Sequence, residues 1–219
     1  MDGKKPAALT EWTYQYIKEM ILNLEIKPGE QINIEEFAEK LEVSRTPIRE
    51  AFLKLETEGL IDVRPRVGYF VVEITEQDIR DLFEIREIIE TRAARKAAES
   101  LTDEKLISAK ELIQNCYKAV EIGDFEKFVP AEIKFHGFLQ ENIENKRLLA
   151  IMDGLNDLMY RVRVLSLQSQ ENVEQTLIEH QKILDALVQR DGDLAEKAMY
   201  DHLINVCDRI VKLLQEINY

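Results

Sequence analysis

Glycine and proline are unevenly distributed along this 219-residue chain, and their distribution limits which folds are possible. Both residues interrupt helices, glycine through its backbone freedom and proline through its fixed φ and missing amide hydrogen. They recur within the first 72 residues, whereas the remainder shows almost unbroken 3.6-residue apolar periodicity. We therefore predict a first domain over residues 1–72, a linker over 73–77 and an all-helical second domain over 78–219.

The first 72 residues carry three apolar helical patterns followed by a β-rich segment. The stripes lie within residues 10–24, 34–41 and 48–55. The segment LIDVRPRVGYFVVEI then changes to β-branched and aromatic residues around a proline and a glycine, which is typical of a hairpin. Two helices, a short turn, a third helix and a hairpin are the order of a winged helix-turn-helix domain.

The third helix carries two arginines four residues apart, on the face that its apolar side chains leave open. A guanidinium can bond guanine O6 and N7 together and can also bind phosphate, so this face suits double-stranded DNA. Two short hydroxyls lie at the same helix end, and the hairpin would form a wing. The alternative is a capped surface helix whose arginines are simply solvated. The candidate DNA-contacting residues are Ser44, Arg45, Thr46, Arg49, Arg66 and Gly68.

The formal net charge of −13 argues against strong nonspecific binding to DNA. Residues 1–72 hold 10 basic and 13 acidic side chains, and residues 73–219 hold 19 and 29, so most of the excess acid lies in the second domain. Acids farther than about 8 Å away are largely screened at physiological ionic strength. Few phosphates are neutralised per subunit. We therefore expect a homodimer on a palindromic operator.

Residues 76–217 divide into helical patterns typical of an antiparallel bundle. The predicted fold class is therefore mainly α, with a winged helix-turn-helix and its small β-hairpin followed by a helical bundle. The six expected helices cover 76–99, 102–122, 125–144, 147–168, 171–190 and 194–217.

The chain has three histidines, and each lies within an apolar stripe of the second domain. A single histidine on an apolar face is most often an ordinary core residue. Three of three, with a glutamate one turn before the first, instead favour a metal site. Imidazoles and a carboxylate in a bundle core are typical ligands of Zn, Mn, Fe or Ni, and the pattern does not distinguish among these metals. The candidate ligands are Glu132, His136, His180 and His202.

Arg86 lies between apolar residues on one helical face, so its guanidinium should point inward and require an anion. One interpretation is an internal ion pair with an acid such as Glu90 or Glu132. The other is a clamp for a small carboxylate ligand whose far end reaches the metal. Arg161 and Arg163 are weaker candidates for that clamp, because helix arginines are commonly solvated.

No apolar run approaches the ~20 residues that a membrane span requires, and the N-terminal MDGKKPAALT lacks the hydrophobic segment of a signal peptide. Cys116 and Cys207 lie singly in helical patterns, which predicts buried, reduced thiols. These features predict a cytoplasmic protein without a membrane partner.

The segment PGEQINIEEFAEKLEVSRTPIREAFLKLETEGLIDVRPRVGYFV resembles the DNA-binding domain of the GntR family of bacterial transcription regulators. The core SRTPIREA, followed by L..EGLI, carries the resemblance. In one departure, Glu35 and Glu36 stand where some relatives have a basic residue that contacts the DNA backbone. The resemblance implies DNA contact by Ser44, Arg45, Thr46 and Arg49, with a wing around Arg66 and Gly68.

The second domain resembles the FCD effector domain, the helical ligand-binding part of one GntR branch. EIKFH and EHQKILDALVQRDGDLAEKAMYDH match its pattern, which implies metal ligation by Glu132 and the three histidines. Most relatives have Asp at the position of Glu132, so a three-histidine site with Glu132 held back is an alternative. The count of six helices resembles the VanR-type subclass, and the histidines disfavour a fatty-acyl ligand.

Together these features predict a dimeric transcription regulator whose affinity for its operator changes when a small organic acid binds at the metal and Arg86. One alternative is a metal-dependent hydrolase-type enzyme with Glu132 as base, although the HExxH spacing of zinc hydrolases is missing. Another is a regulator whose metal is purely structural and joins three helices.

Overall fold

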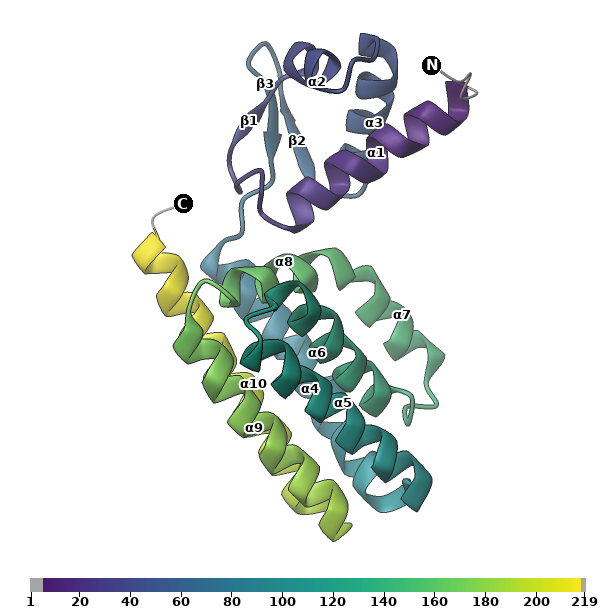
Figure 1. Ribbon diagram of the computed structural model, residues 1–219, viewed down its shortest axis with the longest axis vertical. Coiled ribbons are helices and arrows are strands. Elements are labelled where there is room, and N and C mark those ends of the chain that lie inside the picture. Colours follow the sequence, from purple (N-terminus) through teal and green to yellow (C-terminus); the bar gives the residue numbers. More distant parts are fainter. Residues whose placement is uncertain (1–5, 218–219) are drawn as a thin grey trace. The chain divides into compact units, whose positions relative to one another are not determined.

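The computed structural model describes residues 6–217, which divide into two compact units with a boundary between Ile74 and Thr75 (Figure 1). Within the described range, regular structure consists of ten helices and one small antiparallel sheet. The mainly α fold class predicted from the sequence is therefore confirmed.

The first unit combines three helices with a three-stranded sheet. Its elements are α1 (Pro6–Leu22), β1 (Gln31–Ile32), α2 (Ile34–Lys40), α3 (Arg45–Thr57), β2 (Ile61–Arg64) and β3 (Gly68–Val71). The side chains of Ile17, Phe52 and Leu55 are fully buried. The ring of Phe52 packs edge-on against Phe37 and Tyr69, with centroid distances of 5.9 and 4.9 Å. Elements α2, α3 and β3 therefore share one core.

The strand β1 was missed in the sequence, because two residues are too short to show an alternating pattern. It pairs with β3, which in turn pairs with β2, and all pairs are antiparallel. Val63 lies opposite Tyr69 and Arg64 opposite Gly68, so the hairpin turns over residues 65–67. The predicted winged helix-turn-helix order is confirmed, with one additional strand on the wing.

Gly68 begins β3 with a backbone φ of +143°, a value that other residues rarely adopt. Gln31 in β1 donates a hydrogen bond from Nε2 to the carbonyl of Val67 at 3.1 Å. A Cβ at position 68 would lie 2.8 Å from that same Nε2. The approach of Gln31 to the wing turn therefore requires a glycine.

The second unit consists of helices alone within the described residues. They are α4 (Glu76–Ser100), α5 (Asp103–Glu121), α6 (Phe125–Gln140), α7 (Lys146–Gly154), α8 (Asn156–Ser166), α9 (Gln170–Gln189) and α10 (Gly192–Ile217). The side chains of Thr75 and Asp78 each accept a hydrogen bond from the other's backbone amide, which fixes the start of α4. Residues 76 and 77, which we assigned to the linker, thus form the first turn of α4 instead.

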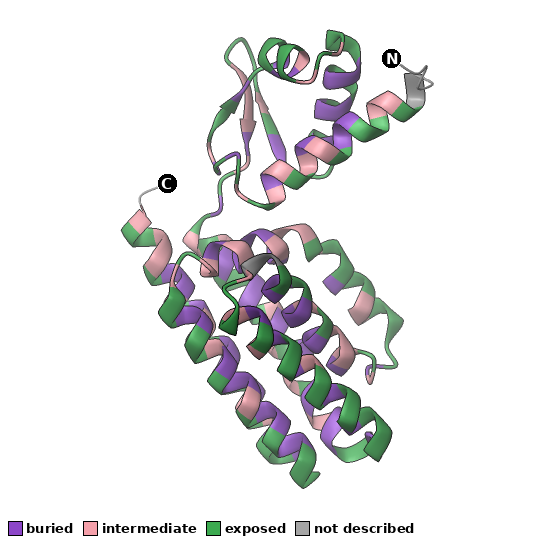
Figure 2. Ribbon diagram, in the orientation of Figure 1, coloured by how far each residue is buried: buried purple, intermediate pink, exposed green. Residues whose placement is uncertain are grey.

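Helices α4 and α10 pack together in opposite directions along most of their length (Figure 1). Arg95 bonds Glu196 at one end of the pair, and Gln215 bonds Glu76 at the other. Residues coloured as buried alternate with exposed ones along the helices, so each helix buries one face (Figure 2). Small side chains on α4 allow α10 to approach closely; those with no exposed surface are Ala93, Ala94, Ala97 and Ala98.

The single helix predicted over residues 147–168 is wrong, because the chain turns at Leu155. This residue has φ −105° and ψ 0°, and its amide donates to the carbonyl of Met152, only three residues earlier, at 3.0 Å. Gly154 lies directly before it and weakens a helix through its backbone freedom. The described part of this unit therefore has seven helices, not the six on which the VanR-type resemblance was based.

Both cysteines are buried and neither forms a disulfide, as expected. Burial raises the pKa of Cys116 to about 12, because a thiolate would lose its hydration there. Among the helices of residues 6–217, none is both long and apolar enough to cross a membrane.

We predict that Gly68→Ala destabilises the first unit more than Gly59→Ala does. Both glycines have positive φ, but a Cβ at Gly59 meets no atom within 4 Å. A Cβ at Gly68 would also displace Gln31 and remove its hydrogen bond to Val67, a further loss of roughly 1 kcal/mol. Chemical denaturation followed by circular dichroism measures both costs. Equal costs for the two variants would contradict the role assigned to Gln31.

Candidate DNA interface and metal centre

The N-terminal end of α3 presents the residues that sequence analysis selected for DNA contact. Ser44, Arg45, Thr46 and Arg49 are all exposed, whereas Ile48 on the same helix is fully buried. Ser44 is the N-cap residue, but its hydroxyl makes no capping hydrogen bond. The hydroxyl is thus not needed to start the helix and faces solvent beside the arginines. Contact of these residues with DNA stays a prediction.

An acid from α2 pairs with the first of the two arginines. Glu35 Oε1 lies 3.1 Å from Arg45 Nη1, and the two side chains keep 56% and 68% of their surface exposed. Exposed pairs of this kind contribute roughly 0.2–1 kcal/mol to stability. The larger effect concerns DNA, because Glu35 adds negative charge where a phosphate would approach.

The wing carries two arginines, Arg64 and Arg66, and their contacts differ. Arg66 is exposed at the turn, with a φ of +67°. Arg64 instead stacks on the ring of Phe70, 4.1 Å from the centroid, and lies 3.3 Å from Asp62. Arg66 is the wing residue that the sequence analysis selected, and its contact with DNA stays a prediction.

In the second unit, the three histidines converge from three helices. His136 of α6, His180 of α9 and His202 of α10 are each at most 1% exposed. One ring nitrogen of each lies within 4.8 Å of the others, and the Nε2 atoms of His136 and His180 are 3.2 Å apart. Rings so close, with nitrogens facing one another, form a group that could hold one metal ion.

Two buried carboxylates hold the Nδ1 side of two of these rings. Glu90 Oε2 lies 2.5 Å from His136 Nδ1, and Glu179 Oε2 lies 3.0 Å from His202 Nδ1. An ionised carboxylate only accepts, so Nδ1 of each ring carries a hydrogen, and in the neutral form of the ring Nε2 keeps its lone pair. His202 Nε2 is buried and has no hydrogen-bond partner within the described residues. This arrangement prepares both rings for coordination through Nε2.

Sequence reasoning missed these two acids as partners of the histidines. Glu90 was considered only as an ion-pair partner of Arg86, and Glu179 was not considered. Glu90 lies 46 residues from His136, and Glu179 lies 23 from His202. Helical periodicity relates residues within one helix, so it gives no signal for a contact between helices. The only usable hint was that an acid at each of these positions would be buried.

Glu132 lies at the edge of the histidine cluster. Its Oε1 is 3.3 Å from His136 Nε2, and its other oxygen pairs with Nε of Arg163. One carboxylate oxygen of Glu132 is therefore paired with an arginine and is not free for a metal. This agrees with the alternative of a three-histidine site in which Glu132 does not ligate. Direct ligation by Glu132 stays a prediction.

The arginines expected at the ligand site are buried rather than solvated. Arg86 is 3% exposed and donates from Nε to Glu90 at 2.8 Å, so the ion-pair interpretation of this residue is observed. Its Nη2 has no hydrogen-bond partner among the described residues. Arg163 pairs with Glu132. Burial lowers the pKa of Arg161 to about 10, against the attraction of two acids outside the cluster, Asp78 and Asp157.

The three imidazoles differ in the direction and strength of their pKa shifts. Burial, reinforced by charge on the other two rings, holds the pKa of His180 well below its ordinary value. Burial also lowers the pKa of His202, although Glu179 opposes the effect. For His136, burial is outweighed by the acids beside it, and its pKa is raised. His180 and His202 are therefore neutral at neutral pH, the form that binds a metal.

Comparison with known proteins agrees with both units. Residues 9–71 match the model of the bacterial regulatory proteins of the gntR family, and residues 81–205 match the FCD domain. The chain belongs to the GntR family. The repressor RspR of Escherichia coli (strain K12) is 30% identical over 203 residues, which cover 93% of this chain and 89% of RspR.

Two further GntR-type proteins align over nearly the whole chain. The regulator YdhC of Bacillus subtilis (strain 168) is 28% identical over 213 residues, covering 97% of this chain and 95% of YdhC. A solved GntR structure from Rhodococcus sp. RHA1 has a TM-score of 0.74 at 21% identity, and the match covers 93% of this chain and 97% of that one. The latter supports the fold alone. This GntR protein is a DNA-binding transcription regulator of the FCD branch and not an enzyme.

We predict that Glu35→Gln strengthens binding to nonspecific duplex DNA and makes the binding more salt-dependent. The change removes a negative charge at the DNA-facing end of α3 and releases Arg45 for a phosphate, which steepens the salt slope by about one. Fluorescence anisotropy over a salt series measures both quantities. Glu39→Gln, one turn later on α2, loses the same charge without a partner on α3 and serves as the control. Identical behaviour of the two variants would contradict the prediction.

Proposed function

We propose that this GntR regulator binds a palindromic operator as a homodimer. Base contacts come from Arg45 and Arg49, with Ser44 and Thr46 beside them, and phosphate contacts come from the wing at Arg66, where Gly68 allows close approach. The exposure of Ser44, Arg45, Thr46, Arg49 and Arg66 supports the proposal. The acidic composition supports the dimer, because a single DNA-binding unit (residues 6–74, here called the reading head) neutralises too few phosphates for firm binding.

We further propose a divalent transition metal, Zn, Ni, Mn or Fe, bound by His136, His180 and His202, with Glu132 beside them. The observation that carries this proposal is the meeting of three buried imidazoles within 4.8 Å. The residues fit such an ion, because the Nε2 of His202 is an unpartnered buried acceptor and two of the rings are neutral. When bound, the metal would supply open coordination positions for an oxygen ligand.

The proposed effector is a small organic acid whose carboxylate is bound by buried arginine. Arg86 Nη2 is buried without a hydrogen-bond partner among the described residues, which is costly for a charged donor. A carboxylate can accept from this nitrogen and from Arg163 in bidentate geometry. Arg161, which is also buried in this unit, is the further candidate.

The proposed mechanism is a shift between two arrangements of the reading heads. Arg86 and Glu90 belong to α4, which begins at Glu76 only five residues after β3 ends at Val71. The backbone therefore connects Arg86, and any ligand bound to it, to the wing through the first ten residues of α4, a length of about 15 Å. The effector alters operator affinity only through its different affinity for the two arrangements.

We predict that Arg49→Ala weakens binding to a palindromic operator by about 10-fold or more, since a base-contacting arginine contributes roughly 1–3 kcal/mol. Lys54→Ala is the control, because Lys54 lies on the same helix but pairs with Glu11 of α1 at 3.1 Å. Electrophoretic shift assays with full and half operators measure the effect and the need for a dimer. Wild-type affinity in Arg49→Ala would contradict the proposed reading head.

We predict that metal-loaded protein gains thermal stability from certain small carboxylic acids and that chelated protein does not, because the ligand binds metal and arginine together. A thermal-shift screen, with the matching alcohols as controls, measures this difference, and element analysis identifies the metal. Operator affinity is measured with and without the acid that stabilises. A purely structural metal gives a different result: chelation then lowers the melting temperature and leaves operator affinity unchanged.

A further inference from the structure

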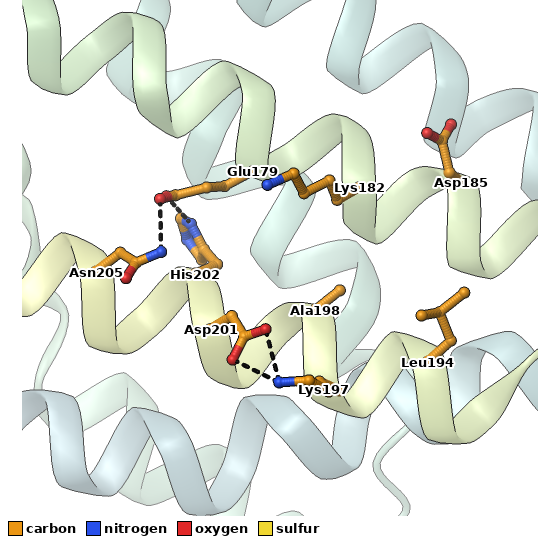
Figure 3. A pocket seen from close by; sticks show the side chains of 9 residues that line it. All are labelled: Glu179, Lys182, Asp185, Leu194, Lys197, Ala198, Asp201, His202 and Asn205. Atoms are coloured by element: carbon orange, nitrogen blue, oxygen red, sulfur yellow. Dashed lines mark hydrogen bonds and ion pairs between the residues drawn. The ribbon is translucent and has the colours of Figure 1, made fainter.

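Glu179 closes the solvent-facing side of the histidine cluster and is not one of the proposed metal ligands. It lines a groove of about 300 Å³ between α9 and α10 (Figure 3). His202 lies at the floor of that groove, and Asn205 lies beside it on the same helix. The bond between Glu179 and His202 therefore separates the metal centre from the groove.

Each carboxylate oxygen of Glu179 accepts two hydrogen bonds. Arg209 grips the carboxylate with two parallel bonds, from Nη1 to Oε1 at 2.8 Å and from Nη2 to Oε2 at 2.9 Å. Asn205 donates to Oε1 at 3.1 Å, and His202 donates to Oε2 at 3.0 Å. The three partners lie at i, i+3 and i+7 on α10, so one face of that helix determines where the carboxylate lies. Rotation of the Glu179 side chain would therefore break at least some of these four hydrogen bonds.

We propose that Glu179 is a positioning residue for the metal, which fixes the tautomer and the orientation of His202 while Arg209 holds Glu179 in place. This inference rests on the proposed metal site. Partners that orient a metal-binding histidine typically change metal affinity by about 10–100-fold when they are lost. The competing role is a structural tie between α9 and α10, which would affect folding and leave the metal geometry alone.

Glu179 is a better test of such positioning than Glu90, its counterpart on His136. Glu90 has no exposed surface, and Arg86 beside it would remain as a buried charge without its acid. Glu179 is 7% exposed at the groove, and Arg209 has 21% of its side chain exposed. A neutral glutamine at position 179 thus leaves an arginine that water can still reach.

The test compares Zn²⁺ affinity and the Co²⁺ absorption spectrum of purified full-length variants. Affinity is measured by competition with a chromophoric chelator, and the Co²⁺ spectrum reports the ligand geometry. Glu179→Gln should weaken Zn²⁺ binding by about 10–100-fold and alter the spectrum. Arg209→Lys, which keeps the charge but loses the two-pronged grip, should cause a smaller loss in the same direction. Asp201→Asn is the control, since Asp201 lines the same groove but bonds Lys197.

Wild-type Zn²⁺ affinity and an unchanged Co²⁺ spectrum in Glu179→Gln would overturn the inference, even if the variant melts at a lower temperature. If Glu179→Gln does not fold, wild-type values in Arg209→Lys overturn it instead. His202→Ala distinguishes this failure from failure of the metal site. Zn²⁺ binding that His202→Ala abolishes and Glu179→Gln preserves overturns the positioning role alone, whereas a wild-type protein that binds no Zn²⁺ overturns both.

Discussion

The second unit depends on pairing the charges that it buries. Arg86, Glu90, Glu132 and Arg163 are all at most 9% exposed, and the histidine cluster lies among them. Removing one partner from such a buried pair typically costs about 3–5 kcal/mol, because the other charge remains without compensation. The unit can therefore keep this core only if α4, α6 and α8 hold these charged side chains beside one another. That requirement explains why the buried charged groups in this core lie next to oppositely charged partners.

The same pairing gives each histidine a different environment. Glu90 and Glu179 fix the hydrogen on Nδ1 of two rings, and each acid is in turn held by an arginine. His180 has no acid at its Nδ1, and its pKa is depressed most strongly. One guanidinium nitrogen of Arg86, Nη2, has no hydrogen-bond partner within the described residues, although the Nε of the same group is bonded to Glu90.

The DNA-binding unit follows the opposite rule, with its functional charges exposed and only loosely paired. Its core of aliphatic and aromatic side chains leaves one face of α3 for solvent. Glu35 lies 3.1 Å from Arg45 at that face and offsets part of its positive charge.

The sequence by itself determined the two-domain order, most helix positions, the exposed face of α3 and the inward direction of the three histidines. These features are local, since apolar periodicity states which face of a helix is buried. Only the tertiary structure decided that Glu90 and Glu179 hold the histidines, that Glu35 meets Arg45, that β1 joins the wing and that the chain turns at Leu155. The first three depend on contacts between different helices or strands, and the last on one residue's backbone angles. Side-chain order along one helix contains no information about which neighbour the fold brings against it.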